Sequence, residues 1–197
     1  MNDSMAKLHS VDPNSIGLED FGKPGNYVGR QVSRWSKQYL DSETESIESM
    51  NNLIDWLPEK LPSEKKTGIV HGDYSLTNVM IGKNDPNVIA ILDWELSTLG
   101  DPCADFNYHC LQYTMNPKLA DREYCKTQGI PIIEDYVKIY SEKINIDLTE
   151  EWDLYSAYNR FKLAGSLQGI LGRVRDGTAA HENAAERASG VRNLSDT

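Results

Sequence analysis

Apolar residues recur at every third or fourth position over much of this chain, which is the spacing of helices that bury one face. The pattern predicts the last turns of a helix over residues 1–9, two helices between 30 and 57 that divide near Asp41-Ser42-Glu43, a helix that begins near Cys103, and helices over 133–144 and 150–174. The glycine-rich stretch 16–29 predicts a loop. The end of the chain, 176–197, is helix-prone at first and is then expected to fray.

The middle of the chain departs from this helical spacing. Short apolar runs at 69–70, 79–81 and 88–94 are separated by polar and turn-forming residues, which predicts three strands. Because GKNDPN between the last two runs is a turn by composition, residues 79–81 and 88–92 are expected to pair as a hairpin. The predicted fold class is therefore α+β and mostly α, with a small β unit embedded in helices.

Composition and charge narrow the class of protein. The chain has 197 residues, of which 39% are apolar, so one globular domain is expected rather than a disordered chain. Thirty acidic and 20 basic side chains give a net charge of -10, which argues against nucleic-acid partners and against attraction to anionic membranes. No apolar run approaches the length of about 18 residues needed to span a membrane. The three cysteines lack CxxC spacing and are interpreted as reduced thiols, so a cytoplasmic protein is expected.

Three polar side chains lie at the ends of the predicted strands. In a hairpin of 79–81 with 88–92, Asn78 at the start of one strand lies beside Asp93 at the end of the other. Two converging oxygen ligands suit Mg²⁺, which keeps water and substrate phosphate in its other positions. Asp73, on the preceding loop, can reach the same point and accept a proton from an attacking hydroxyl. The alternative is an ordinary polar turn, in which Asp and Asn bond their own backbone.

These residues also carry a resemblance to a known family. HGDYSLTN (71–78) resembles the H-x-D-x-x-x-x-N catalytic loop of the aminoglycoside phosphotransferase and choline kinase group, which is related to the protein kinases. ILDWE resembles the strand that bears the metal-binding Asp of that group, and GDPCADF resembles its G-D-P-x-x-D segment. A more specific likeness is to the phosphotransferase-like domain associated with acyl-CoA dehydrogenases, through LHSVD, RQVSRW and FKLAGSLQG. The resemblance implies a protein-kinase-like C-terminal lobe over residues 1–197, with the β-hairpin unit carrying the catalytic loop.

The family pattern assigns a role to each matching residue. It implies that Asp73 is the catalytic base, that Asn78 and Asp93 hold Mg²⁺, and that ATP is the phosphate donor. The acceptor implied is a small-molecule hydroxyl, as on a hydroxy acid or its acyl-CoA thioester. Asp73 and His71 form the catalytic group of this prediction, in which His71 orients the loop through backbone hydrogen bonds.

Further residues are expected in supporting roles. Asp101 and Asp105 are predicted to cap the following helix and to brace the loop, while Glu95 ranks below Asp93 as a metal ligand. Arg30 and Arg34 are either a solvated helix face or guanidinium groups that bind an anionic acceptor. The sequence identifies no partner for His9, which lies in the LHSVD stretch.

The sequence departs from the family pattern at its start. The family carries an N-terminal lobe with a strand lysine that clamps the nucleotide, whereas none of Lys7, Lys23 and Lys37 lies in such a strand. GKPGNYVG lacks the flanking strands that a glycine-rich phosphate flap needs. The expectation is a C-terminal lobe without the nucleotide clamp, partnered by a separately encoded N-terminal lobe or by an acyl-CoA dehydrogenase. The alternatives are an inactive binding or regulatory lobe, a fragment that lacks the N-terminal lobe, and, ranked lowest, a magnesium-dependent phosphohydrolase.

Overall fold

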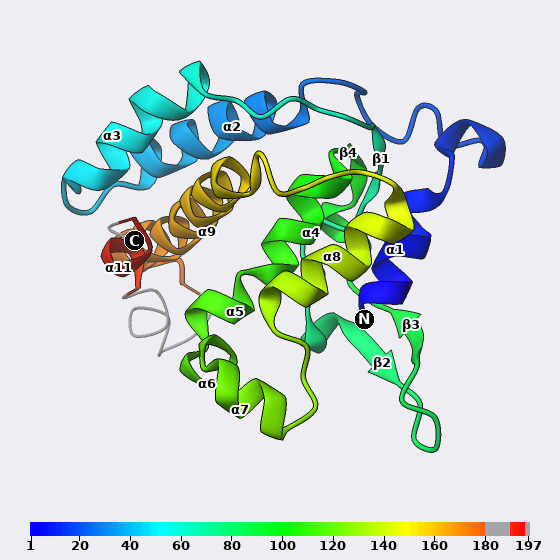
Figure 1. Ribbon diagram of the computed structural model, residues 1–197. Coiled ribbons are helices and arrows are strands. Elements are labelled where there is room, and N and C mark those ends of the chain that lie inside the picture. Colours follow the sequence, from blue (N-terminus) through cyan, green and yellow to red (C-terminus); the bar gives the residue numbers. More distant parts are fainter. Residues whose placement is uncertain (180–189, 196–197) are drawn as a thin grey trace. The chain divides into compact units, whose positions relative to one another are not determined.

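A computed structural model describes residues 1–179 and 190–195 of the chain (Figure 1). The helices are α1 (Asn2–Ser10), α2 (Tyr27–Ser42), α3 (Glu48–Trp56), α4 (Pro102–Cys110), α5 (Gln112–Met115), α6 (Pro117–Ala120), α7 (Arg122–Thr127), α8 (Ile133–Ile144), α9 (Trp152–Arg175) and α11 (Val191–Ser195). The strands are β1 (Gly68–Val70), β2 (Val79–Ile81), β3 (Val88–Ile91) and β4 (Thr98–Gly100). The stretch predicted to be helix-prone and then to fray falls largely on 180–189 and 196–197, outside the described residues.

The chain divides into two compact units. The loop unit consists of Met1–Tyr27 and Glu64–Tyr155, and it contains the strands and the predicted catalytic loop. The helical unit consists of residues 28–63 and the chain from 156 onwards. Among the residues that the structure describes, no helix combines the length and apolarity needed to cross a membrane.

An aromatic cluster forms the core of the loop unit. Phe106 of α4 stacks on Tyr140 of α8 with ring centroids 3.6 Å apart, and both side chains are fully buried. α1 packs against α8 and β1, while α4 packs against β1, so these elements enclose the cluster (Figure 1). Burial of two aromatic rings is worth several kcal/mol, about 1.5–3 kcal/mol for each side chain. This core supports the polar segment that follows β1.

The predicted hairpin is confirmed, and the end of its second strand is corrected. β2 pairs antiparallel with β3, with Val79 opposite Ile91. The third strand was predicted to run to residue 94, and this is wrong because Asp93 adopts a left-handed conformation, with φ 63°. Aspartate tolerates that conformation better than most residues. The chain therefore leaves the strand and enters a 3-10 turn at Trp94–Leu96, and the hairpin itself projects from the rest of the loop unit (Figure 1).

A strand that the sequence pattern did not predict completes the β structure. β4 pairs antiparallel with β1, with Ile69 opposite Leu99. A Cβ atom at Gly100 would lie 2.7 Å from the Tyr27 ring and 2.9 Å from the Val70 side chain, so glycine allows this close approach. A strand of three residues that ends in glycine shows too little alternation of apolar and polar residues to be distinguished from a turn in the sequence.

The longer predicted helices are confirmed, and the ends of α8 are those predicted, whereas the ends of the others differ by a few residues. The two helices expected between 30 and 57 are α2 and α3, while 133–144 is α8 and 150–174 is α9. The loop predicted over 16–29 is wrong at its end, because α2 already begins at Tyr27. The amide of Tyr27 donates to the Glu64 carboxylate at 2.8 Å, so a distant side chain satisfies this helix terminus. The short helices α5, α6 and α7 were not predicted.

Close packing of α2 and α9 characterises the helical unit. A Cβ atom at Gly172 would lie 2.6 Å from the Ser42 Cβ atom, so the two helices touch through glycine. Gln168 is fully buried and donates from Nε2 to the Ser42 carbonyl at 2.7 Å. The FKLAGSLQG stretch thus serves as a helix-packing surface in this unit.

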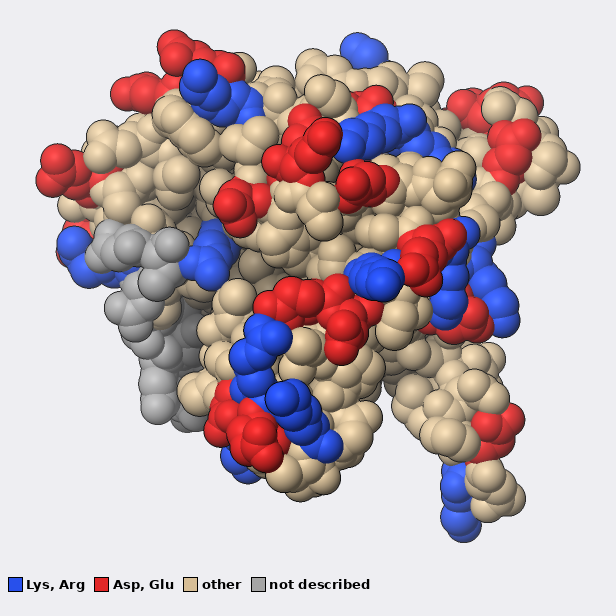
Figure 2. Space-filling view, in the orientation of Figure 1, with Lys and Arg blue, Asp and Glu red and all other residues tan. Residues whose placement is uncertain are grey.

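Acidic and basic side chains are interspersed over the visible face of the molecule (Figure 2). Exposed ion pairs occur among the described residues, such as Lys7 with Asp3 at 2.8 Å. Exposed pairs of this kind contribute about 0–1 kcal/mol each. The buried side chains, rather than these pairs, therefore account for most of the stability.

Candidate active site

The segment from His71 to Asn78 connects β1 with β2. His71 is fully buried, and its Nε2 atom lies 2.8 Å from the Leu92 carbonyl oxygen, to which it donates. Its Nδ1 atom accepts from the Asp73 amide at 3.2 Å. Since a carbonyl can only accept and an amide can only donate, the imidazole carries its hydrogen on Nε2. His71 thus ties the loop to the residue that follows β3.

Asp73 and Asn78 are in direct contact. The Asn78 side-chain nitrogen donates to the Asp73 carbonyl at 2.9 Å and to its Oδ2 atom at 3.0 Å. Both residues are half-buried. These two bonds fix the amide of Asn78 with its nitrogen towards Asp73, so its Oδ1 atom is the remaining acceptor. The sequence pattern did not predict this contact.

Asp105 of α4 holds the start of the loop through its backbone. Its Oδ2 atom accepts from the His71 amide at 2.8 Å, and its Oδ1 atom accepts from the Gly72 amide at 2.9 Å. Gly72 has a φ of 84°, and a Cβ atom there would lie 2.7 Å from the Leu96 carbonyl oxygen. Glycine at this position therefore allows both the left-handed conformation and the close approach of the loop backbone to Leu96.

Two further side chains of α4 hold the next two residues of the loop. The Tyr108 hydroxyl is hydrogen-bonded to the Asp73 carboxylate, and burial together with that carboxylate raises the pKa of Tyr108. His109 lies 3.2 Å from the Tyr74 carbonyl, to which Nδ1 donates. Burial lowers the pKa of His109 to about 4, so its ring is neutral near pH 7.

Positions 105, 108 and 109 share one face of α4, because residues three and four apart lie together on a helix. That face contacts loop residues 71 to 74 in chain order. Tyr108 and His109 were not predicted as site residues. Their spacing from Asp105 indicates a shared helix face, but the sequence does not show that the loop contacts that face.

Asp93 lies at the same end of the hairpin as Asn78. The amide of Leu92 donates to the Asn78 carbonyl at 2.8 Å, which extends the pairing of β2 and β3 by one step. Asp93 is exposed, and its carboxylate makes no hydrogen bond or ion pair with the described residues. Glu95 follows in the exposed 3-10 turn. The structure thus brings the two predicted metal ligands to one end of the hairpin.

The donor set fits a magnesium ion. Asn78 Oδ1 and the Asp93 carboxylate are hard oxygen donors, and both lack a hydrogen-bond donor in the described part of the chain. No group of three or more His, Cys, Asp or Glu side chains gathers as a metal site within residues 1–179 and 190–195. Mg²⁺ needs no such group, because it commonly keeps waters and substrate phosphates in addition to one or two protein ligands. A softer metal such as Zn²⁺ fits this oxygen pair poorly.

Asp101 is the N-cap of α4, as predicted. Its Oδ1 atom accepts from the Cys103 amide at 2.8 Å, and its Oδ2 atom accepts from the Tyr155 hydroxyl at 2.8 Å. Burial raises the pKa of Asp101 to about 6, although the bond from Tyr155 opposes that rise. Asp101 therefore secures the start of the helix whose side chains hold the loop.

The predicted acceptor-binding residues lie elsewhere in the chain. Arg30 and Arg34 are on α2, in the helical unit, and the Arg34 guanidinium lies 5.6 Å from the Trp35 ring centroid. Their role remains a prediction.

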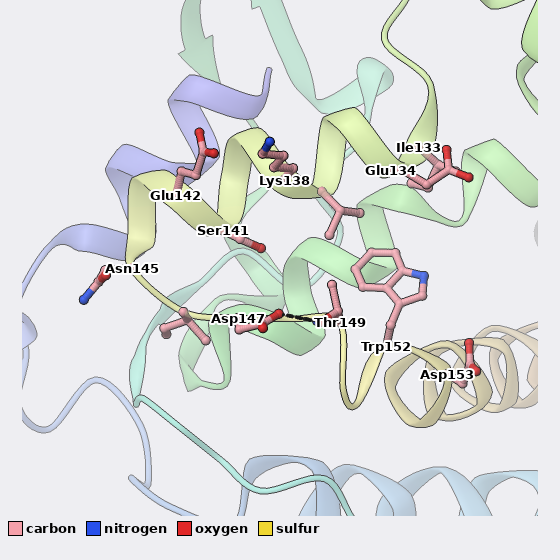
Figure 3. Close-up of a pocket in the computed structure, with 12 residues that line it drawn as sticks. Ile133, Glu134, Lys138, Ser141, Glu142, Asn145, Asp147, Thr149, Trp152 and Asp153 are labelled. Atoms are coloured by element: carbon pink, nitrogen blue, oxygen red, sulfur yellow. Dashed lines mark hydrogen bonds between the residues drawn. The ribbon is translucent and has the colours of Figure 1, made fainter.

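A cavity of about 780 Å³ in the loop unit does not involve the predicted site residues. Its lining comes from α8, from the segment that leads into α9 and from the start of α9, including Val137, Ile146 and Trp152. In Figure 3, Lys138, Ser141 and Glu142 lie along α8, and the Trp152 side chain lies below that helix. The predicted catalytic loop is therefore not part of this cavity.

Comparisons with known proteins agree with the motifs. The sequence profile of the phosphotransferase enzyme family matches residues 2–155. Mouse acyl-CoA dehydrogenase family member 10 is 41% identical over 192 residues, which cover 94% of this chain and 18% of that protein. Human acyl-CoA dehydrogenase family member 11 is 34% identical over 200 residues, which cover 99% of this chain and 26% of that protein. The chain thus spans about a quarter or less of the curated relatives it matches.

Solved structures give the same fold. A crystal structure from Ralstonia eutropha, provisionally named an aminoglycoside phosphotransferase, has a TM-score of 0.93 and 45% identity, and the match covers 99% of this chain and 61% of that one. A macrolide 2′-phosphotransferase from Brachybacterium faecium has a TM-score of 0.58 at 16% identity, covers 98% of this chain and 57% of that one, and supports the fold alone. The predicted mostly helical, protein-kinase-like fold is confirmed. On these matches and on the loop of Asp73 and Asn78, the chain belongs to the phosphotransferase enzyme family.

Proposed function

We propose that the chain is the catalytic lobe of an ATP-dependent phosphotransferase that acts on a hydroxyl group of a small molecule. The observation that carries this proposal is the arrangement of Asp73, whose carboxylate is bonded by Asn78 and Tyr108 while its backbone is bonded by His71. A carboxylate fixed in this way is suited to orient a hydroxyl and accept its proton.

The reaction then follows the general course of phosphoryl transfer. The acceptor oxygen forms a bond to the γ-phosphorus of ATP, the bond from that phosphorus to the β,γ-bridging oxygen breaks, and ADP leaves. The proton of the acceptor hydroxyl passes to Asp73. Asn78 and Asp93 would hold Mg²⁺, which neutralises charge on the phosphates when it is bound. The protein contributes mainly position and electrostatic stabilisation.

The hairpin offers a surface for the nucleotide-binding lobe of the family. Large apolar side chains are exposed on and beside β2 and β3, and they are Leu76, Met80, Ile81, Ile89, Leu92, Trp94 and Leu96. Such a group of exposed apolar residues is typical of an interaction site. We infer that a β-rich lobe with a phosphate-binding lysine covers this surface, whether it is part of the same chain or separately encoded. Contact with an acyl-CoA dehydrogenase is the alternative partner, and it rests on the names of the relatives.

Calorimetric titration with Mg²⁺ and ATP tests the site and the lobe together. The chain is expected to bind nucleotide at millimolar concentration, and Asp93→Ala is expected to abolish binding because it removes the charged metal ligand. Addition of the β-rich lobe is expected to tighten binding. Asp85→Ala is the matched control, because Asp85 lies in the exposed turn between β2 and β3. Failure of the chain to bind nucleotide, alone and with the lobe, would favour an inactive regulatory lobe.

The proposed acceptor is a hydroxy acid or a hydroxyacyl-CoA. Its support is the similarity to proteins named as acyl-CoA dehydrogenase family members, in preference to the more distant macrolide phosphotransferase. Transfer of labelled γ-phosphate to a hydroxyacyl-CoA, and none to an aminoglycoside, is the expected result. The opposite preference would refute this acceptor class. Phosphate release without an acceptor would indicate a phosphohydrolase instead.

We also infer a cytoplasmic location. Cys103, Cys110 and Cys125 are free and buried, which suits a reducing compartment.

A further inference from the structure

His9 is fixed at three points within the loop unit. Its carbonyl accepts from the Lys66 ammonium at 2.7 Å, and its Nδ1 atom lies 2.5 Å from the Tyr140 hydroxyl. Its Nε2 atom lies 3.1 Å from the Oδ2 atom of Asp105. The His9 side chain is fully buried, and the Tyr140 ring that it meets is itself stacked on Phe106. The imidazole therefore has little freedom to rotate.

The bond to Asp105 has a defined direction. A carboxylate oxygen is an acceptor, so Nε2 of His9 carries the hydrogen and donates it. The same Oδ2 atom accepts the amide of His71 at 2.8 Å, and the other oxygen accepts the amide of Gly72 at 2.9 Å. The Asp105 carboxylate thus lies between the His9 ring and the backbone of the loop.

We propose that His9 is a positioning residue for the catalytic loop, and that it acts through Asp105. A carboxylate can rotate about the bond that carries it, and the donor from His9 selects the rotation in which its two oxygens face the two loop amides. The loop in turn carries Asp73, two residues beyond His71. The expected effect on turnover rests on the proposed function. The hydrogen bonds that Asp105 accepts from His9, His71 and Gly72 do not depend on it.

Outer contacts of this kind have measurable consequences for a reaction. Loss of a side chain that orients a ligand or a catalytic group commonly costs about 10–100-fold in affinity or activity. A displacement of about 1 Å at a reacting group can cost about 100-fold in rate. His9 is therefore expected to affect turnover although it touches no substrate.

Two substitutions separate the two ring nitrogens of His9. The amide nitrogen of glutamine lies near the place of Nε2, so His9→Gln keeps a donor for Asp105. The amide of asparagine lies near the place of Nδ1, so His9→Asn loses that donor. Tyr140→Phe removes the partner of Nδ1, together with a bond of the same hydroxyl to the Pro102 carbonyl at 3.3 Å, and leaves the Nε2 contact with Asp105 in place. All three are studied in the full chain, with the β-rich lobe present for turnover.

Amide hydrogen exchange measured by NMR is the deciding experiment. His9→Asn is expected to lower the protection of the His71 and Gly72 amides by about 10-fold or more, which is about 1.4 kcal/mol of local opening. His9→Gln and Tyr140→Phe are expected to leave it within about 3-fold of the unsubstituted protein. The Gly82 amide, which bonds the Asn87 carbonyl in the hairpin turn, is the internal control.

Turnover supplies the second readout. His9→Asn is expected to lower kcat by about 10–100-fold with the KM for ATP nearly unchanged, and His9→Gln is expected to restore most of kcat. Equal effects of the two substitutions on exchange would show that His9 only fills space and would overturn the inference. Unchanged protection in His9→Asn would overturn it as well. Altered exchange in a protein that shows no turnover even without substitution would instead contradict the proposed function.

Discussion

Asp73→Asn is expected to lower kcat of the proposed phosphotransferase by about 100- to 10,000-fold, because in the proposed reaction it removes the group that accepts the proton of the acceptor hydroxyl. Asparagine keeps the size of the side chain and an acceptor oxygen, so the contacts with Asn78 and Tyr108 can persist in part. Nucleotide binding should therefore stay close to that of the unsubstituted protein. Steady-state transfer of γ-phosphate measures the first effect, and calorimetry with Mg²⁺ and ATP measures the second.

Asp85→Asn is the control for this substitution. It makes the same chemical change in the exposed turn between β2 and β3, where Asp85 accepts a bond from the Asn87 side chain at 2.6 Å. It should leave turnover and binding unaffected. If Asp73→Asn abolishes nucleotide binding, Asp73 is a metal ligand and the roles assigned to the two aspartates are reversed. If it changes neither quantity, Asp73 takes no part in the reaction.

Asp105→Asn is expected to destabilise the protein by about 1–3 kcal/mol, the cost of leaving a buried hydrogen-bond donor without its acceptor. Asp105 is only 3% exposed, and its oxygens face three donors from His9, His71 and Gly72. An amide would turn one of those acceptor positions into a donor, so at least one buried donor would lose its partner. Urea unfolding followed by circular dichroism measures the loss.

Asp121→Asn provides the comparison for stability. Asp121 is exposed and caps α7, where its carboxylate accepts from the Glu123 amide at 2.9 Å. Asparagine caps helices about as well as aspartate, so this variant should stay within about 0.5 kcal/mol of the unsubstituted protein. A cost below about 1 kcal/mol for Asp105→Asn would mean that the loop is held mainly by other contacts.

Local patterns in the sequence are sufficient to predict the hairpin and the longer helices. The hairpin carries its own turn, and α8 keeps a helical spacing over its whole length. The start of α2 depends instead on Glu64, which lies 37 positions away, and β4 depends on its pairing with β1. These features arise from tertiary contacts, which spacing within a short window does not contain.

The residues of the candidate site likewise fall into those that a local motif predicts and those that depend on tertiary contacts. Asp73 and Asn78 stand in a motif of fixed spacing and Asp93 stands in the ILDWE segment that follows, so the sequence alone predicts them together. His9 lies 96 positions from Asp105, and its role depends on the packing of α1 beside α8. Tyr108 and His109 are ordinary residues of a helical pattern until the loop is placed against that face of α4. Supporting residues that act across the fold leave no local pattern.

The face of α4 that contacts loop residues 71 to 74 has a consequence for the energetics of turnover. Four consecutive residues are held by one rigid helix, so the loss of their conformational entropy is incurred when the chain folds. Under the proposed function, it is not incurred again when each acceptor molecule binds. A loop of this kind needs little rearrangement as charge moves from hydroxyl to phosphate, which is the property that lets fixed groups stabilise a transition state. The side chains of α4 thus fix the conformation of the predicted catalytic loop before any substrate binds.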